Sequence, residues 1–344
     1  MKYRIILLGV GAVGRHFLQL LQDKDKVLQH RYGVSPVVVA ALDSSGGLFD
    51  EGGLSPALLR AHKEEGGKLA NLPGGVRGLT AQEVLAHVQA DALIDAAPVE
   101  LTTGEPGLSA VRSALERGMD VVLANKAPLV LAYRELHALA ERRGGRLAFS
   151  ATVCGGLPVI NMGQRDLVAA RVDRFRGILN STTNYILEQM GQGHSYEAAL
   201  AEAQRRGIAE ADPSLDVEGW DTANKLVIIA NAILGMPATL DDVEVEGITG
   251  LSEGEIRQAA RTGTPVKLVA EALRQENGEY TLRVAPVPVS EADFLAQVRG
   301  WEMGVVFETD IYEVISAKID ERGPMATAAA VLRDIVTLAR ARAR

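Results

Sequence analysis

The chain has 344 residues, of which 47% are hydrophobic and 23% charged, and its formal net charge is −8. This length suits about two domains, and the ordinary composition excludes a disordered or fibrous protein. The negative charge disfavours nucleic acid and anionic membrane as partners. No apolar run approaches the ~18 residues of a membrane span. The chain has a single cysteine, Cys154, which fits the reducing cytoplasm. We therefore expect a protein that acts on a small molecule.

The first part of the chain alternates apolar segments with helical stretches, which is typical of a parallel sheet covered on both faces. Its basic start before an apolar run resembles a signal peptide, but the glycines at fixed offsets favour a strand and turn. Strands are expected at 3–10, 37–43, 92–97 and 120–125, and helices at 106–117 and 130–142. These elements predict an α/β fold, with a Rossmann-type doubly wound nucleotide-binding domain over residues 1–150.

After about residue 150 the pattern changes to long helices followed by extended segments. Helices are expected at 182–191, 195–206 and 213–234, and strands at 264–273, 279–289 and 304–316, where β-branched residues concentrate. We expect an α+β domain with a mixed sheet over residues 151–322, for substrate binding and dimerisation. The Ala-rich segment 323–344 is expected to be a helix that returns to the first domain.

The segment "LLGVGAVG" places Gly9, Gly11 and Gly14 in G-x-G-x-x-G spacing between a strand and a helix. Such a loop can bind a pyrophosphate at the helix N-terminus, although the same glycine spacing can also occur in a purely structural turn. The second strand ends in Asp43, where a carboxylate can bind a ribose 2′-hydroxyl and favours NAD. The small residues of "DSSGG" after it leave NADP open.

The segment "GIAEADPSLDVEGWDTANK", residues 207–225, concentrates carboxylates ahead of a lysine. Asp212 before Pro213 is the order of an N-cap and a first helical residue. Asp221 and Lys225 are four residues apart and share one helix face, and Trp220 with the apolar residues after Lys225 predicts that this helix is buried. The pair is either a structural ion pair or a proton-transfer group.

Glu210 and Asp216 add negative charge to this segment, which suits a substrate with an ammonium group. An amino acid is therefore the expected substrate class.

With these residues the chain resembles the homoserine dehydrogenases. The family's signature matches at eight positions from Ala203 to Lys225, and the segments "VVLANKAPL", "ATVCGGLPVI", "GILNSTTNYIL" and "ERGPMATAAAV" follow the family in the same order. The resemblance implies reduction of L-aspartate 4-semialdehyde to L-homoserine with NADPH or NADH, in the biosynthesis of threonine, methionine and isoleucine. It also implies a homodimer.

The resemblance assigns catalytic roles to two lysines and an aspartate. Lys225 is expected to be the general acid, oriented by Asp221, and Lys126 matches the second lysine of the family. The expected substrate residues are Thr182, Glu210, Asp216, Asp221 and Lys225. The expected cofactor residues are Gly9, Gly11, Ala12, Val13, Gly14, Asp43, Ala97, Pro98, Lys126 and Gly323.

The resemblance further implies a monovalent cation such as sodium. Its ligands are expected to be the main-chain oxygens of Ser150, Val153, Gly155 and Leu157. The chain departs from the family at Ser181, where glycine is common, which affects the backbone next to Thr182. Only 13 residues follow "GPMATAAAV", so we expect a short form without the regulatory ACT domain.

Two alternatives fit parts of the same pattern. Another Rossmann-type semialdehyde oxidoreductase, such as aspartate-semialdehyde dehydrogenase, needs a nucleophilic cysteine, for which Cys154 is the single candidate. A catalytically silent NAD(P)-sensing module needs no more than the glycine loop. The Asp221–Lys225 pair and Lys126 favour an enzyme over the sensing module.

Overall fold

The computed structural model describes residues 1–343, which form two units. Unit 1 consists of Met1–Gly156 together with Gly323–Arg344, and unit 2 consists of Leu157–Arg322. Unit 1 is therefore discontinuous along the chain. No helix of residues 1–343 is both long and apolar enough to span a membrane.

Unit 1 contains a seven-stranded sheet in the order β4-β3-β2-β1-β5-β6-β7. The strands are β1 (Lys2–Leu8), β2 (Ser35–Asp43), β3 (Gly46–Phe49), β4 (Val76–Arg77), β5 (Ala92–Asp95), β6 (Asp120–Leu123) and β7 (Leu147–Ala148). β1, β2, β5, β6 and β7 pair in parallel, and β3 and β4 are added antiparallel at one edge. The apolar runs of β1, β5 and β6 are buried because helices cover the sheet.

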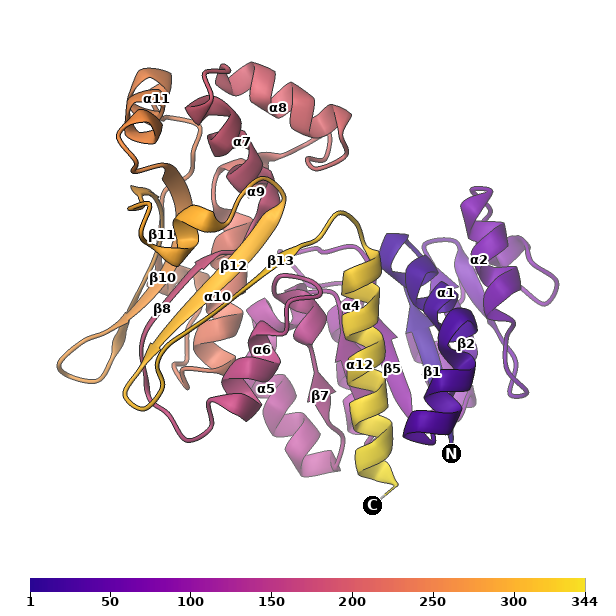
Figure 1. Cartoon of the computed structure of the whole chain (residues 1–344). Helices are drawn as coiled ribbons and strands as arrows, with labels where there is room; N and C mark the ends of the chain where they lie inside the picture. The colour runs from indigo at the N-terminus through magenta and orange to yellow at the C-terminus, as the bar shows by residue number, and fades with distance from the viewer. Residues whose placement is uncertain (344) are drawn as a thin grey trace. The chain divides into compact units, whose positions relative to one another are not determined.

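The helices of unit 1 include the last helix of the chain. They are α1 (Ala12–Val27), η1 (Leu28–Tyr32), α2 (Pro56–Glu64), η2 (Leu69–Asn71), α3 (Ala81–His87), α4 (Gly107–Glu116), α5 (Ala127–Arg143), η3 (Ser150–Thr152) and α12 (Met325–Arg342). α12 lies alongside α1 (Figure 1), and its Ala328, Val331 and Ile335 join the core beneath β1 and β2. The parallel sheet with its helices confirms the doubly wound fold.

Unit 2 contains a six-stranded mixed sheet in the order β13-β12-β8-β10-β11-β9. The strands are β8 (Val172–Ile178), β9 (Val243–Val245), β10 (Val266–Arg274), β11 (Tyr280–Pro288), β12 (Glu302–Thr309) and β13 (Glu313–Asp320). Neighbours are antiparallel except β9, which is parallel to β11. The mixed sheet expected for the second domain is thus confirmed.

Some helices of unit 2 pack on its sheet, and others pack on neighbouring helices. The helices are α6 (Val159–Asn161), η4 (Met162–Asp166), α7 (Ser181–Gly191), α8 (Tyr196–Arg205), α9 (Ser214–Val217), α10 (Trp220–Ala232), η5 (Leu240–Asp242), α11 (Glu253–Arg261) and η6 (Phe294–Gln297). α7 and α10 both contact β10. Both helices are mostly buried, which fits their contacts with the sheet.

Two expected elements of unit 2 are wrong in detail. The single helix expected over 213–234 is two helices, α9 and α10, because Gly219 between them has a φ of +89°. The expected burial of the helix is confirmed for most of α10, although Trp220 at its start is 39% exposed. The strand expected over 304–316 is the hairpin of β12 and β13, whose turn contains no glycine or proline and is held by the Tyr312 N–H, which donates to Thr309 Oγ1.

Candidate active site

The glycine loop joins the central strand β1 to α1 at the carboxyl end of the first sheet. Gly9 has a φ of +92°, and a Cβ there would lie 2.4 Å from the backbone of Ala96. A Cβ on Gly14 would lie 2.3 Å from the Gly9 carbonyl oxygen. Gly11, the N-cap of α1, faces open space instead. Two glycines therefore permit close packing, and the third leaves the N-terminus of α1 accessible to a phosphate.

Asp43 ends β2, and its carboxylate is engaged within unit 1. Oδ1 accepts from the N–H (2.9 Å) and the hydroxyl (2.5 Å) of Ser45. Oδ2 accepts from the Lys63 ammonium (2.6 Å) and the Leu69 N–H (3.2 Å). Burial alone would raise the pKa of Asp43, but these donors lower it to about 2. All four acceptor positions of the carboxylate are occupied, so a ribose hydroxyl must displace one donor to bind there.

The other expected cofactor residues of unit 1 lie near strand ends or helix starts. Ala12 and Val13 open α1, and Lys126 is the N-cap of α5 after β6. Ala97 and Pro98 follow β5, and the exposed Gly323 precedes α12. The carboxyl ends of β1, β5 and β6 are neighbours in the sheet, which is where doubly wound folds bind their ligands.

Asp95, the last residue of β5, was missed by the sequence analysis. Its side chain is fully buried, and it accepts hydrogen bonds from the Ala97 N–H (3.0 Å) and the Asn125 amide (3.1 Å). Burial raises the pKa of Asp95 to about 7 in spite of these donors. The carboxyl group ties the segment after β5 to the segment after β6. The sequence feature that could have identified Asp95 is a single acidic residue at the end of an apolar strand.

Asp221 and Lys225 lie one turn apart on α10, as their spacing predicts. Lys225 Nζ donates to Asp221 Oδ2 (2.7 Å) and to the Leu179 carbonyl oxygen (2.6 Å). The lysine and aspartate side chains are only 13% and 10% exposed. The ammonium is thus positioned by two acceptors that come from two elements, the helix α10 and the segment between β8 and α7.

Asn180 connects this ion pair to Asp216 and was also missed. Its Nδ2 donates to Asp216 Oδ1 (2.7 Å) and to Asp221 Oδ2 (2.8 Å). Its Oδ1 accepts from the Thr183 N–H (2.9 Å), which makes it the N-cap of α7. Burial, and then the negative charge of Asp221, raise the pKa of Asp216, while the Asn180 amide opposes that change. Two carboxylates therefore share one buried network.

Of the other two expected substrate residues, Thr182 lies next to this network and Glu210 does not. Thr182 is buried at the start of α7, and its hydroxyl donates to the Ile208 carbonyl (3.1 Å) and lies near Asp216. Glu210 is exposed, and in the part of the chain that the structure describes its carboxylate has no hydrogen bond or ion pair. The structure thus brings together Thr182, Asp216, Asp221 and Lys225 and leaves Glu210 at the surface.

Comparisons with known proteins decide the family. The model of the homoserine dehydrogenase NAD binding domain matches residues 9–150, and the homoserine dehydrogenase model matches residues 158–336. The chain is 37% identical over 333 residues to the homoserine dehydrogenase of Methanocaldococcus jannaschii, which covers 96% of this chain and 97% of that protein. The chain belongs to the homoserine dehydrogenase family.

Further relatives support the cofactor class of this homoserine dehydrogenase family member. A protein of Pseudomonas canavaninivorans named NAD(+)-dependent homoserine dehydrogenase is 33% identical over 336 residues, which cover 97% of this chain and 96% of that protein. A hyperthermophilic archaeal homoserine dehydrogenase solved in complex with NADPH matches with a TM-score of 0.85 and 27% identity, covering 98% of each chain. With the NAD binding domain, these matches identify an NAD(P)-dependent oxidoreductase.

The family assignment also argues against the alternative of an aspartate-semialdehyde dehydrogenase, which needs a cysteine nucleophile. Cys154 is buried, with 1% of its surface exposed. A buried thiol is not accessible to an aldehyde substrate, so its environment is typical of a structural cysteine.

The segment expected to ligate a cation begins with Ser150, which α12 holds in place. The Ser150 N–H and hydroxyl donate to the Asp334 carboxylate at 2.9 and 2.7 Å. Cys154 and Gly155 have φ values of 54° and 52°, so the chain turns between Val153 and Leu157. No three His, Cys, Asp or Glu side chains within residues 1–343 are grouped to hold a metal ion. The cation on main-chain oxygens of this segment stays a prediction from the resemblance.

The departure from the family at Ser181 has a simple structural outcome. Ser181 is the first residue of α7, and a right-handed helical backbone accepts any L-residue without strain. The serine therefore leaves the start of α7 undistorted.

Proposed function

We propose that the chain interconverts L-aspartate 4-semialdehyde and L-homoserine with NADP or NAD, and that Lys225 transfers the proton. The observation that carries the proposal is the largely buried Lys225 ammonium, held 2.7 Å from Asp221 Oδ2 and 2.6 Å from the Leu179 carbonyl oxygen. When bound, the reduced cofactor supplies a hydride to the aldehyde carbon. The family places this reaction in threonine, methionine and isoleucine biosynthesis.

The proton step follows from the charge that develops on the aldehyde oxygen. As the new C–H bond forms, this oxygen becomes an alkoxide, and Lys225 Nζ gives it a proton to form the hydroxyl group of homoserine. In the reverse direction the neutral amine takes the hydroxyl proton. Asp221 and the Leu179 carbonyl fix the direction of the Nζ–H bonds, so the amine keeps its place in both protonation states.

The substrate ammonium is assigned to the carboxylates around Asn180. Asp216 and Asp221 share the Asn180 amide, and this concentration of negative charge raises the pKa of Asp216 after the larger effect of burial. A bound ammonium ion lowers the free energy of that arrangement. Thr182 and the surface residue Glu210 are assigned to the remaining polar groups of the substrate, on the family resemblance.

The cofactor is assigned to the carboxyl end of the first sheet. Gly11 fits this role because its missing side chain leaves the helix N-terminus open. The residues assigned on this basis and on the resemblance are Gly9, Gly11, Ala12, Val13, Gly14, Asp43, Ala97, Pro98, Lys126 and Gly323. Lys126 is in addition assigned a catalytic role, and the main-chain oxygens of Ser150, Val153, Gly155 and Leu157 are assigned to a sodium-like cation.

The assembly is proposed to be a homodimer formed through unit 2. β13 is an edge strand of its sheet, and the exposed fraction of Val314 on it is 61%. An edge strand offers unpaired backbone groups to a second copy. Sedimentation equilibrium should give twice the monomer mass, and Val314→Lys should lower it toward one monomer. The single buried cysteine fits the cytoplasm, which is the proposed location.

The reaction is tested with the purified chain, the semialdehyde and either reduced cofactor. NAD(P)H oxidation should require the semialdehyde, and homoserine with the oxidised cofactor should give the reverse reaction. Calorimetry with the cofactor alone provides the control for folding. Cofactor binding without turnover of either substrate would reject the enzyme and favour a sensing module.

A further inference from the structure

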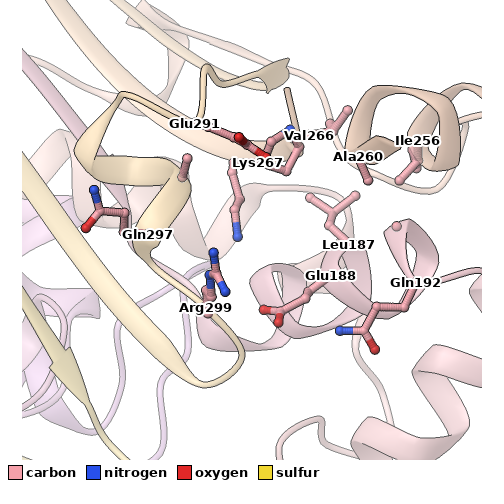
Figure 2. Close-up of a pocket in the computed structure, with 13 residues that line it drawn as sticks. Leu187, Glu188, Gln192, Ile256, Ala260, Val266, Lys267, Glu291, Gln297 and Arg299 are labelled. Atoms are coloured by element: carbon pink, nitrogen blue, oxygen red, sulfur yellow. The ribbon is translucent and has the colours of Figure 1, made fainter. Parts of the chain in front are cut away.

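Unit 2 contains a cavity of about 430 Å³ that none of the expected substrate or cofactor residues lines. Its walls are the second half of α7, the helix α11, the start of β10 and the segment 291–299 (Figure 2). The charged groups around it are Lys267, Arg299, Glu188 and Glu291. Such a site is large enough for a small metabolite or ion.

Lys267 is the buried anchor of this cavity, with only 3% of its surface exposed. Its Nζ donates to Asn184 Oδ1 (2.8 Å) and to the Val298 carbonyl oxygen (2.7 Å). A lysine ammonium has three N–H donors, and no third acceptor is found among residues 1–343. Both acceptors are uncharged, so the positive charge of Lys267 has no ion-pair partner in this part of the structure.

Arg299 brings a second positive charge to the same place. Figure 2 shows its guanidinium group pointing toward the Lys267 ammonium. In the described chain the Arg299 side chain has no hydrogen bond or ion pair. Glu188 lies beside the two cations, and its carboxylate accepts from the Gly300 N–H. Two cations that face each other across a cavity are an arrangement that an anion stabilises.

We propose that this cavity binds a small oxyanion, a carboxylate or a phosphate, whose oxygens accept hydrogen bonds from Lys267 Nζ and the Arg299 guanidinium. The bound anion supplies the third acceptor of the buried ammonium and separates the two positive charges. This site goes beyond the proposed reaction and does not depend on it.

The effect of pH gives the site a second signature. The pKa of Lys267 is lowered to about 8, mainly by burial; the charge of Arg299 acts in the same direction, and those of Glu188 and Glu302 act in the opposite direction. The fourth charged group at the cavity, Glu291, belongs to the segment after β11. As the pH rises through about 8, Lys267 loses its proton and its charge, so binding of the oxyanion weakens.

The cavity is also connected to the proposed catalytic network through α7. Asn184, which accepts from Lys267, donates to the carbonyl oxygens of Val298, Gly300 and Glu302. The same helix begins at the Asn180 cap. An anion that fixes Lys267 therefore restrains the helix that carries Asn180.

The test is isothermal titration calorimetry of the full chain with saturating NADPH, so that phosphate positions of the cofactor site are filled. Inorganic phosphate, succinate and citrate are titrated separately at constant ionic strength in chloride, at pH 7 and pH 9. We expect one of them to bind with a stoichiometry of one per chain and to bind more weakly at pH 9. If phosphate binds more tightly than citrate and succinate, the natural ligand carries a phosphate group. If citrate or succinate binds more tightly than phosphate, the natural ligand is a carboxylate.

Arg299→Gln removes one of the two cations without breaking any contact of the described structure. It should weaken binding at least about tenfold, the effect of losing a charge-assisted hydrogen bond. Arg340→Gln on α12 removes the same charge from an exposed arginine far along the chain and should leave the affinity unchanged. Absence of binding by all three anions, or equal binding to wild type and Arg299→Gln, overturns the proposal.

Discussion

The Lys225 ammonium is held by one charged and one uncharged acceptor. This arrangement matters for a group that must both give and take a proton. The Asp221 carboxylate attracts the charged form, whereas the Leu179 carbonyl can accept from either form of the amine. The side chain therefore keeps its position when the proton has left, which lowers the reorganisation needed in each turnover.

The first prediction concerns this lysine. Lys225→Ala should lower kcat by about 10²–10⁴, the range for losing a positioned acid or base, and should leave the affinity for the cofactor unchanged. Stopped-flow or steady-state rates and calorimetry measure the two quantities. Lys318→Ala, which removes an exposed lysine from an ion pair with Glu302, is the matched control. Turnover of Lys225→Ala within a few-fold of wild type would remove Lys225 from the mechanism.

A second prediction concerns cofactor preference. Asp43→Ala removes a carboxylate at the end of β2 and releases the ammonium of Lys63, which now pairs with it at 2.6 Å. A free cation there attracts a 2′-phosphate, so the ratio of kcat/KM for NADPH to that for NADH should rise about tenfold. Asp50→Ala, an exposed turn residue, should leave the ratio unchanged. A constant ratio in Asp43→Ala would place the adenosine ribose elsewhere.

The third prediction uses the raised pKa of Asp216, caused first by burial and then by Asp221. The ionised carboxylate binds the substrate ammonium, so kcat/KM should fall as the pH drops through this raised pKa. Asp216→Asn should raise KM and move the acid limb of the kcat/KM profile to lower pH. Asp212→Asn, at an exposed turn, should retain the wild-type profile. An acid limb that stays in place in Asp216→Asn assigns it to another group.

At the scale of elements, the break between α9 and α10 places the catalytic pair. Gly219 turns the chain with a left-handed backbone, and α10 then starts at Trp220, one residue before Asp221. A continuous helix from Ser214 would rotate Asp221 and Lys225 relative to Asn180. The break therefore determines which side of α10 faces the segment before α7.

The fourth prediction is made on this glycine. Gly219→Ala forces a non-glycine residue to a φ near +89° and brings its Cβ to 3.1 Å from Val245 Cγ1. The free energy of unfolding should fall by about 1–2 kcal/mol, with a loss of activity because Asp221 moves. Urea unfolding measures the change. Gly250→Ala, where the added Cβ has open space, should change the stability little.

Contacts between residues close in the sequence were predictable, and contacts between distant segments were not. The spacing of Asp221 and Lys225 was informative because i,i+4 contacts are local. Asn180 lies 41 residues before Asp221, and its role depends on a long-range contact between the two side chains, which no local pattern encodes. The hairpin of β12 and β13 was missed because Asp310, Ile311 and Tyr312 form its turn without glycine or proline.

At the scale of the whole molecule, the two sheets were predictable from apolar runs and β-branched segments. The arrangement of the candidate site residues was only partly predictable from the sequence. Asp43 stood out by its place after a strand, but its ion pair with Lys63 depends on the return of α2 toward β2. The charge of Asp216 and Asp221 was visible, whereas the surface position of Glu210 was not. Long-range packing, rather than composition, decides each of these cases.

The fifth prediction concerns the pH dependence of overall stability. The folded state raises the pKa of Asp95, through burial, from 3.8 to about 7. Between these values the folded state binds more protons than the unfolded state, so this group lowers the free energy of unfolding as pH rises, with no further change above about 7. Asp95→Asn should remove that contribution. Urea unfolding at pH 5, 6, 7 and 8 measures both slopes, and identical slopes for the two proteins would contradict the assignment.

The position of α12 has a consequence for biosynthesis on the ribosome. Ala328, Val331 and Ile335 complete the core of unit 1, and Asp334 holds Ser150, yet these residues are translated after all of Leu157–Arg322. At ~5–20 residues per second, unit 1 waits ~10–30 s for its last helix. During that interval the surface of α1 that later contacts α12 is uncovered. Until α12 packs on it, this apolar surface of the nascent N-terminal unit is available to chaperones that bind apolar segments.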